Sequence, residues 1–251
     1  MAESIGGAIQ GGGGRRGRWT LQPGGSAPYL GTMKVSVRGN PDFGEATCVL
    51  DPGEKVLCEG RSMSRMSAHM ELKVRTQGGL LRSAARAVAG GESFFLSEYS
   101  SDQGGFVTVV PGTPGAVVHR QLQGETLVLT AGSYLASGEG IDVRTKFGGL
   151  KSLFSGEGAF LLFAKGHGDL LFNAFGGIVE RDLEGSLTVD SGHVVAWEPS
   201  LTYQIKAVGG LKQTMFSGEG LVMEFRGRGK IWLQTRTLKE TAGWITPYLM
   251  F

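Results

Sequence analysis

Residues 147–158 read FGGLKSLFSGEG, and residues 208–220 read VGGLKQTMFSGEG, so one glycine-punctuated pattern occurs twice. A looser copy begins with QGGL at residues 77–80 and ends with GGES at residues 90–93. Each copy leads into an apolar stretch of strand length, at residues 94–96, 160–163 and 221–225. The same order in three places predicts an internally repeated fold.

Each copy also follows the same kind of turn. Residues 49–53 (VLDPG), 128–132 (VLTAG) and 188–192 (TVDSG) hold a pair of apolar or β-branched residues, then a polar residue and a glycine. A unit of a few strands exposes one apolar face, which is stable only when it packs on its siblings. We therefore expect three pseudo-equivalent units that share one core.

The other apolar segments have strand character, which predicts an all-β protein. They are short and rich in β-branched and aromatic residues, at 34–37, 106–110, 116–118, 126–130, 159–165, 186–189, 193–197, 221–225 and 230–234. Glycine accounts for 43 of the 251 residues. Beyond Met33 the glycines separate these segments, as turns and bulges do.

Two segments have helical spacing instead. Residues 80–88 place leucine, alanine and valine on one helical face, and residues 238–249 place Leu238, Ala242, Ile245 and Leu249 on one stripe. The second begins with Thr237 and Glu240, the spacing of a capping box. We expect a short C-terminal helix there.

These patterns divide the chain into three parts. Residues 1–31 form a glycine-rich, flexible arm whose small and polar residues cannot build a core. Residues 32–237 form the β domain, with units at about 32–125, 126–185 and 186–237. Residues 238–251 form the helix and an apolar tail.

The composition limits location and partners. A net charge of +2 gives no electrostatic reason to expect nucleic acid. Cys48 and Cys58 have no further ligands at zinc-site spacing, so we interpret them as reduced thiols. The first ten residues lack the pattern of an export signal, and no run of about 18 apolar residues predicts a membrane span. We expect a cytoplasmic protein.

The ordered series of GGL, then a glycine-glutamate turn, then an aromatic-rich strand resembles the altered-inheritance-of-mitochondria 24 family. The resemblance covers residues 33–250 and includes the stretches 190–193 (DSGH), 197–199 (WEP), 234–236 (QTR) and 247–249 (PYL). It implies a double-stranded β-helix or sandwich-like body, similar to the tryptophan RNA-binding attenuation protein. The fungal mitochondrial member is linked to inner-membrane organisation as a scaffold-like factor, and bacterial members are uncharacterised. No motif here carries over tryptophan or RNA binding.

The glutamates of the three repeated turns, Glu92, Glu157 and Glu219, are the first candidate site. A ring of carboxylates could hold a hard cation. Alternatively, each carboxylate accepts hydrogen bonds from its own glycine turn. The Gly-Gly-Leu turns lack the residues of a phosphate-binding loop, so we expect no bound cofactor.

Catalytic patterns are absent from the sequence. The four histidines, His69, His119, His167 and His193, stand singly, without the spacing of a cupin metal site. There is also no nucleophile elbow and no paired-carboxylate motif. An enzyme is disfavoured, and we expect no metal site.

Both ends of the chain hold candidate interaction residues. Residues 15–19 form a small basic and aromatic cluster that could touch phosphates or lipid head groups, or could remain solvated. Trp244, Ile245, Tyr248, Leu249 and Phe251 are more apolar than a free tail tolerates. They are expected to dock on the chain's own body, on a neighbouring subunit or on a protein partner.

The sequence therefore favours a non-catalytic structural or interaction protein that assembles with itself, with a trimer suggested by analogy. Two alternatives stay open. A small-ligand-binding β protein would need a sizeable apolar pocket. A cupin-like metal enzyme would need His167 or His193 within coordination distance of a carboxylate.

Overall fold

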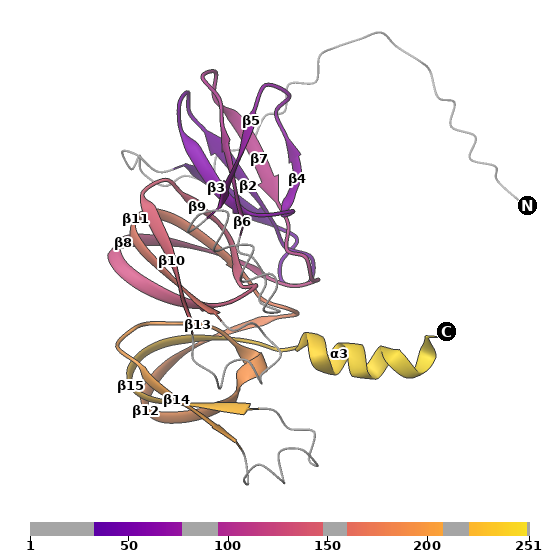
Figure 1. Cartoon of the computed structure of the whole chain (residues 1–251), viewed down its shortest axis with the longest axis vertical. Helices are drawn as coiled ribbons and strands as arrows, with labels where there is room; N and C mark the ends of the chain where they lie inside the picture. Colours follow the sequence, from indigo (N-terminus) through magenta and orange to yellow (C-terminus); the bar gives the residue numbers. More distant parts are fainter. Residues whose placement is uncertain (1–32, 77–94, 148–159, 208–220, 250–251) are drawn as a thin grey trace, which may run out of the picture. The chain divides into compact units, whose positions relative to one another are not determined.

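The computed structural model describes residues 33–76, 95–147, 160–207 and 221–249, all of which belong to one unit, residues 31–251. The described chain is mostly β with a short helix near its C-terminus, which confirms the predicted fold class (Figure 1). The repeated glycine motifs and the helix predicted at residues 80–88 lie outside these residues. The strands of the first half are β1 (Lys34–Arg38), β2 (Glu45–Leu50), β3 (Lys55–Glu59), β4 (Met63–Met66), β5 (Glu71–Thr76), β6 (Phe95–Ser100) and β7 (Gly105–Val109).

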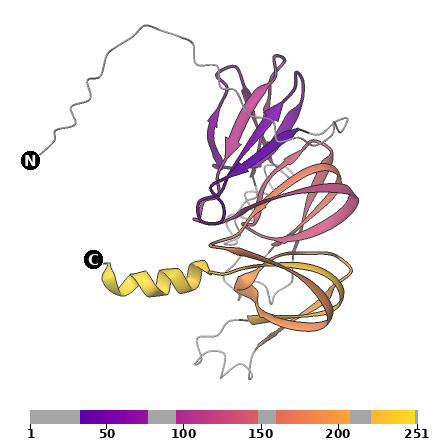
Figure 2. The ribbon, with the colours of Figure 1, turned by 180° about the vertical axis from the view of Figure 1, so that it is seen from behind.

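The second half begins with β8 and ends in the helix. Its elements are β8 (Val117–Thr130), β9 (Tyr134–Gly138), β10 (Ile141–Phe147), β11 (Phe160–Asn173), β12 (Ile178–Asp190), η2 (Ser191–His193), β13 (Val194–Trp197), β14 (Thr202–Ala207), β15 (Leu221–Gln234), α3 (Leu238–Ile245) and η3 (Thr246–Tyr248). Figure 2 shows the same elements from behind.

Over the described residues the strands form two antiparallel sheets. The smaller sheet has the order β1-β2-β7-β4. The larger sheet runs β12-β15-β13-β8-β11-β9-β3-β6-β5, with β10 added to β11 and β14 added to β15. Strands far apart in the sequence are joined where β9 pairs with β3 and where β13 pairs with β8.

Four of the strands are longer than the sequence predicts because glycines bend them without ending them. Strands β8 and β11 pair along most of their length, and so do β12 and β15. Near the middle of each strand lies a glycine with positive φ: Gly124 at 107°, Gly166 at 146°, Gly185 at 114° and Gly227 at 127°. Residues with a Cβ rarely adopt this conformation, so glycine permits the kink.

Within the described residues, three apolar clusters form the interior. One is centred on β8, β9 and β11 and includes Phe172 and Trp232, whose rings meet edge to face at 5.9 Å. A second lies between β2, β3 and β7 and contains both cysteines. The third surrounds Trp197 and Phe225, whose ring centroids are 5.3 Å apart. The predicted reduced thiols are confirmed, since Cys48 and Cys58 are buried and free.

Several residues that carry the family resemblance hold loops in place. The Gln234 side chain accepts a hydrogen bond from Phe175 N and donates one to Gly192 O. Glu198 accepts from the backbone N–H of Lys230 at 3.0 Å and from Arg120 at 3.3 Å. These stretches of sequence are therefore explained by packing and hydrogen bonding within the fold.

The C-terminal helix begins where the sequence predicts. Thr237 is its N-cap, and its hydroxyl accepts a hydrogen bond from Glu240 N at 3.1 Å. The helix α3 ends at Ile245, earlier than the expected stripe, and continues as the 3-10 turn η3. Pro247 lies in that turn and lacks the backbone N–H that would continue an α-helix.

Candidate functional site

The repeat glutamates Glu92, Glu157 and Glu219 lie outside the described residues. A further copy of the tetrapeptide that holds Glu157 and Glu219 is described, however. Residues 137–140 read SGEG, as do residues 155–158 and 217–220. Our sequence analysis missed this copy, although an exact tetrapeptide match would have found it.

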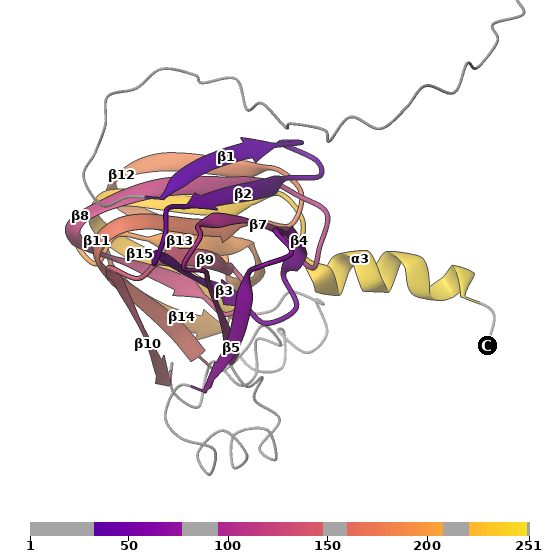
Figure 3. The same cartoon turned by 90° about the horizontal axis from the view of Figure 1, so that it is seen from above.

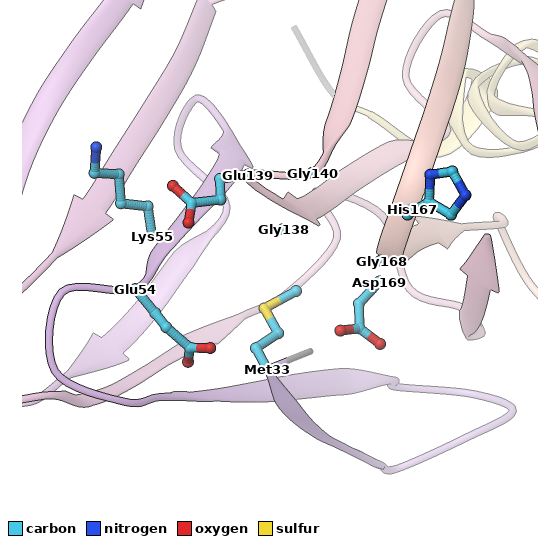
Figure 4. A pocket seen from close by; sticks show the side chains of 9 residues that line it. All are labelled: Met33, Glu54, Lys55, Gly138, Glu139, Gly140, His167, Gly168 and Asp169. Carbon is cyan, nitrogen blue, oxygen red and sulfur yellow. The ribbon is translucent and has the colours of Figure 1, made fainter. Parts of the chain in front are cut away.

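The described SGEG turn connects β9 to β10 and borders a small hollow (Figure 4). The cavity volume is about 40 Å³, enough for a water molecule or two and far below the size of a ligand pocket. Its lining comes from β11, from the end of β9 and the turn that follows, from the turn before β3 and the first residue of β3, and from the residue before β1: Met33, Glu54, Lys55, Gly138, Glu139, Gly140, His167, Gly168 and Asp169.

Asp169 is the most unusual residue of this hollow. Its side chain is 4% exposed, and His119 Nε2 lies 2.7 Å from its Oδ1. The other oxygen, Oδ2, is buried and has no hydrogen-bond partner among the described residues. Because a buried polar atom is normally satisfied, an ordered water in the hollow is the simplest partner for Oδ2.

Two thiols occupy the neighbouring core. Burial raises the pKa of Cys48 to about 12, and the negative charge of Asp169 adds to the effect. Burial also raises the pKa of Cys58, with a further contribution from Cys48. Both side chains are therefore neutral thiols at physiological pH and are not poised as nucleophiles.

Two of the other three histidines contact a backbone carbonyl oxygen, and the third lies against a glycine. His69 Nε2 is 2.7 Å from Gly104 O, and His193 Nδ1 is 2.7 Å from Gln234 O. His167 is exposed and lies over Gly124. In the described ranges, no group of three or more His, Cys, Asp or Glu side chains is placed to hold a metal ion.

The C-terminal arm, defined here as residues 238–249, is the most exposed apolar feature. It starts on the β body, where Thr237 is buried and Glu240 Oε2 lies 3.8 Å from His193 Nε2. Beyond that point α3 points away from the strands (Figures 1 and 3). No residue of α3 or η3 is buried.

The predicted tail residues lie on this arm, except Phe251, which is outside the described residues. The exposed fractions are 69% for Trp244, 43% for Ile245, 73% for Tyr248 and 48% for Leu249. The rings of Trp244 and Tyr248 lie 6.1 Å apart. Leu238, which the prediction did not include, is 63% exposed. These side chains are thus left uncovered by the chain's own described body.

These features define an antiparallel β protein with an exposed apolar arm. A family model described as "Mitochondrial biogenesis AIM24" matches residues 35–236, and the chain belongs to this family. The predicted family is therefore confirmed, whereas the likeness to the tryptophan RNA-binding attenuation protein stays a prediction.

Two proteins from Streptococcus pyogenes are similar to this chain, one by sequence and one by structure, and neither name states an activity. The uncharacterized protein M6_Spy0233 of serotype M6 is 31% identical over 226 residues, which cover 86% of this chain and 91% of that protein. The crystal structure of protein SPYM3_0169 matches with a TM-score of 0.75 at 30% identity, covering 86% of this chain and 100% of the other.

No helix in the described part of the chain is long and apolar enough to cross a membrane.

Proposed function

We propose that this chain is a non-catalytic structural or interaction protein that binds other protein surfaces, including copies of itself. The observation that carries this proposal is the C-terminal arm. Its five large apolar side chains are 43% to 73% exposed, and nothing in the described body covers them. Clustered apolar side chains on a surface mark a place that another macromolecule covers.

The size of the arm supports this role. A helix of eight residues gains little stability by itself in water, so contact with a partner would stabilise it. A fully buried aromatic side chain removes about 150–250 Å² from water, and Trp244 and Tyr248 are 69% and 73% exposed. Docking both rings would bury about 200–350 Å², worth about 5–9 kcal/mol before the cost of association.

The three-unit architecture is part of the proposal, and strand pairing supports it. Outer strands β5, β10 and β14 pair with β6, β11 and β15, and each of these pairs with a short strand, β3, β9 or β13. The strand pairs β8·β11 and β12·β15 are also alike, because each of the four strands has a positive-φ glycine near its middle. This pairing favours unit boundaries just before β8 and β12, slightly earlier than the sequence suggests.

The two alternative functions gain no specific support. The hollow beside Asp169, at about 40 Å³, does not offer the apolar pocket that a small-ligand-binding protein needs. His193 Nε2 is 3.8 Å from a carboxylate oxygen of Glu240, and its Nδ1 lies 2.7 Å from the Gln234 carbonyl oxygen. In the described part of the chain, no group of three or more potential ligands surrounds this histidine. The trimeric state, the cytoplasmic location and peripheral membrane contact stay predictions.

Sedimentation velocity of the full chain at several concentrations tests the proposal. We expect the native chain to associate, and the double variant W244A/Y248A to raise the dissociation constant by at least about tenfold. Phe43→Ala is the matched control, because Phe43 is also 73% exposed but lies in the turn between β1 and β2. Equal association of both variants and the native chain would contradict a binding role for the arm.

A further inference from the structure

Strand β5 ends the larger sheet and has an open edge. It pairs with β6 from Glu71, opposite Ser100, to Thr76, opposite Phe95. No strand of the described residues pairs with its other edge (Figures 1 and 3). Backbone N–H and C=O groups along such an edge can accept another strand.

The open edge is apolar on one face. Leu72 is 49% exposed and Val74 is 67% exposed. Since they are two residues apart in a strand, both side chains lie on the same face of the sheet. The edge therefore offers an apolar pair together with unpaired backbone groups.

This apolar pair continues a row of core residues. In register across the sheet, Val56 faces Tyr99, which faces Leu72. Val56 is fully buried and Tyr99 is 4% exposed, so burial decreases only at the last strand of the row. The core-facing side of the sheet thus extends beyond what the described chain covers.

The other two outer strands differ from β5 at the same positions. The second and fourth residues of β5 correspond to Tyr203 and Ile205 of β14, which are half-buried against the third apolar cluster. On β10 the core-facing apolar residues, Ile141 and Val143, are each 2% exposed. Only β5 among these three outer strands presents such side chains to solvent.

We propose that β5 pairs with β5 of a second copy of this chain, antiparallel and with Lys73 at the twofold axis. In this register Leu72 faces Val74 of the partner subunit, so each apolar side chain meets another. Glu71 likewise faces Arg75 of the partner subunit, which pairs opposite charges. The strand sequence ELKVRT is therefore complementary to itself in this register.

Moving the axis toward Val74 loses this complementarity. An axis between Lys73 and Val74 would place Leu72 opposite arginine and Val74 opposite lysine. The cost of the chosen register is one like-charge contact, between Lys73 and Lys73 of the partner subunit. Glu71 is free to change partners, because it is 70% exposed and its ion pair with Lys73 spans 3.8 Å.

This inference rests on the self-association in the proposed function but uses residues separate from the arm. The first test is the monomer–dimer equilibrium of the full chain by sedimentation velocity. We expect Val74→Lys to weaken the dimer by at least about tenfold, and Lys73→Thr to strengthen it by removing the like-charge contact. Val179→Lys is the control, because Val179 is an exposed apolar residue on β12, and it should leave the equilibrium unchanged.

The register is tested by cross-linking under mild oxidation. Lys73→Cys should give a disulfide-linked dimer, because residue 73 faces its own copy across the axis. Leu72→Cys should cross-link much less, since it faces residue 74. The native cysteines are buried with 0% exposure and should not interfere.

The outcomes separate the two proposals. A chain that stays monomeric at all concentrations, or a dimer that V74K and V179K affect equally, overturns the β5 interface. A dimer lost in W244A/Y248A but kept in V74K also overturns it, while the proposed role of the arm stands. A dimer lost in V74K and kept in W244A/Y248A supports the β5 interface and contradicts the binding role proposed for the arm.

Discussion

Replacing His119 with alanine should destabilise the protein through the carboxylate that it leaves behind. His119 lies 2.7 Å from Asp169, whose side chain is 4% exposed. The second oxygen of Asp169 already has no hydrogen-bond partner in the part of the chain that the structure describes. The loss of a hydrogen bond to a charged group costs about 1.5–3 kcal/mol, and leaving a buried carboxylate without that partner adds to the cost.

Partial exposure of the site to water reduces the expected loss of stability. The His119 side chain is 33% exposed, so water can reach part of the space that the ring vacates. We therefore expect the free energy of unfolding to fall by about 2–4 kcal/mol. That is a large share of the roughly 5–15 kcal/mol that stabilises a typical domain.

Urea unfolding followed by circular dichroism measures this loss. His167→Ala is the matched control, because His167 is on the same sheet, on β11, but is exposed, and it should change stability by less than about 0.5 kcal/mol. The double variant H119A/D169N should recover most of the loss, because an amide carries no charge to bury. If H119A costs no more than H167A, the buried carboxylate does not depend on His119 and the reasoning fails.

Two further predictions concern the same part of the β body. A Cβ at Gly140 would lie 2.2 Å from the carbonyl oxygen of His167, so Gly140→Ala should lower the free energy of unfolding by about 2 kcal/mol or more, measured by thermal unfolding. The control is Gly112→Ala, which should lower it by less than about 0.5 kcal/mol, because a Cβ at Gly112 would meet nothing within 4 Å. Equal melting temperatures for both would contradict the close approach. Burial raises the pKa of Cys48 from 9.0 to about 12, so the folded protein holds the thiol proton more tightly than the unfolded chain does. The stability that Cys48 contributes is therefore complete below pH 9 and is lost as the pH rises toward 12. Cys48→Ala should therefore lose stability less steeply than the native chain above pH 9 in urea titrations, and an unchanged slope would count against the buried thiol as the cause.

Local features were predictable because short-range chemistry determines them. The start of α3 follows from the hydroxyl of Thr237 and its distance to Glu240 N. The strand segments follow from runs of β-branched and aromatic residues. The sequence did not reveal that Gly124 and Gly185 lie inside continuous strands, because a positive φ serves a turn and a bulge equally well.

Long-range pairing was not predictable from the sequence. His119 and Asp169 are 50 residues apart and meet only because β8 pairs with β11. Read along the chain, His119 is an isolated histidine, and Asp169 follows a histidine and a glycine without any recognisable motif. A single sequence contains no signal for such a pair, since the register that creates it depends on the packing of both strands.

The two ends of the larger sheet differ in a way that limits assembly. Strand β12, at the end opposite β5, is 13 residues long, and a flat edge of that length would invite other chains. It carries exposed charges at residues 180–182 and 184 and a positive-φ glycine at Gly185, which discourage further pairing. Strand β5 has exposed Leu72 and Val74 instead. With one protected end and one self-complementary end, the main strand path of the larger sheet, as described from β12 to β5, closes at a dimer when β5 pairs with its copy.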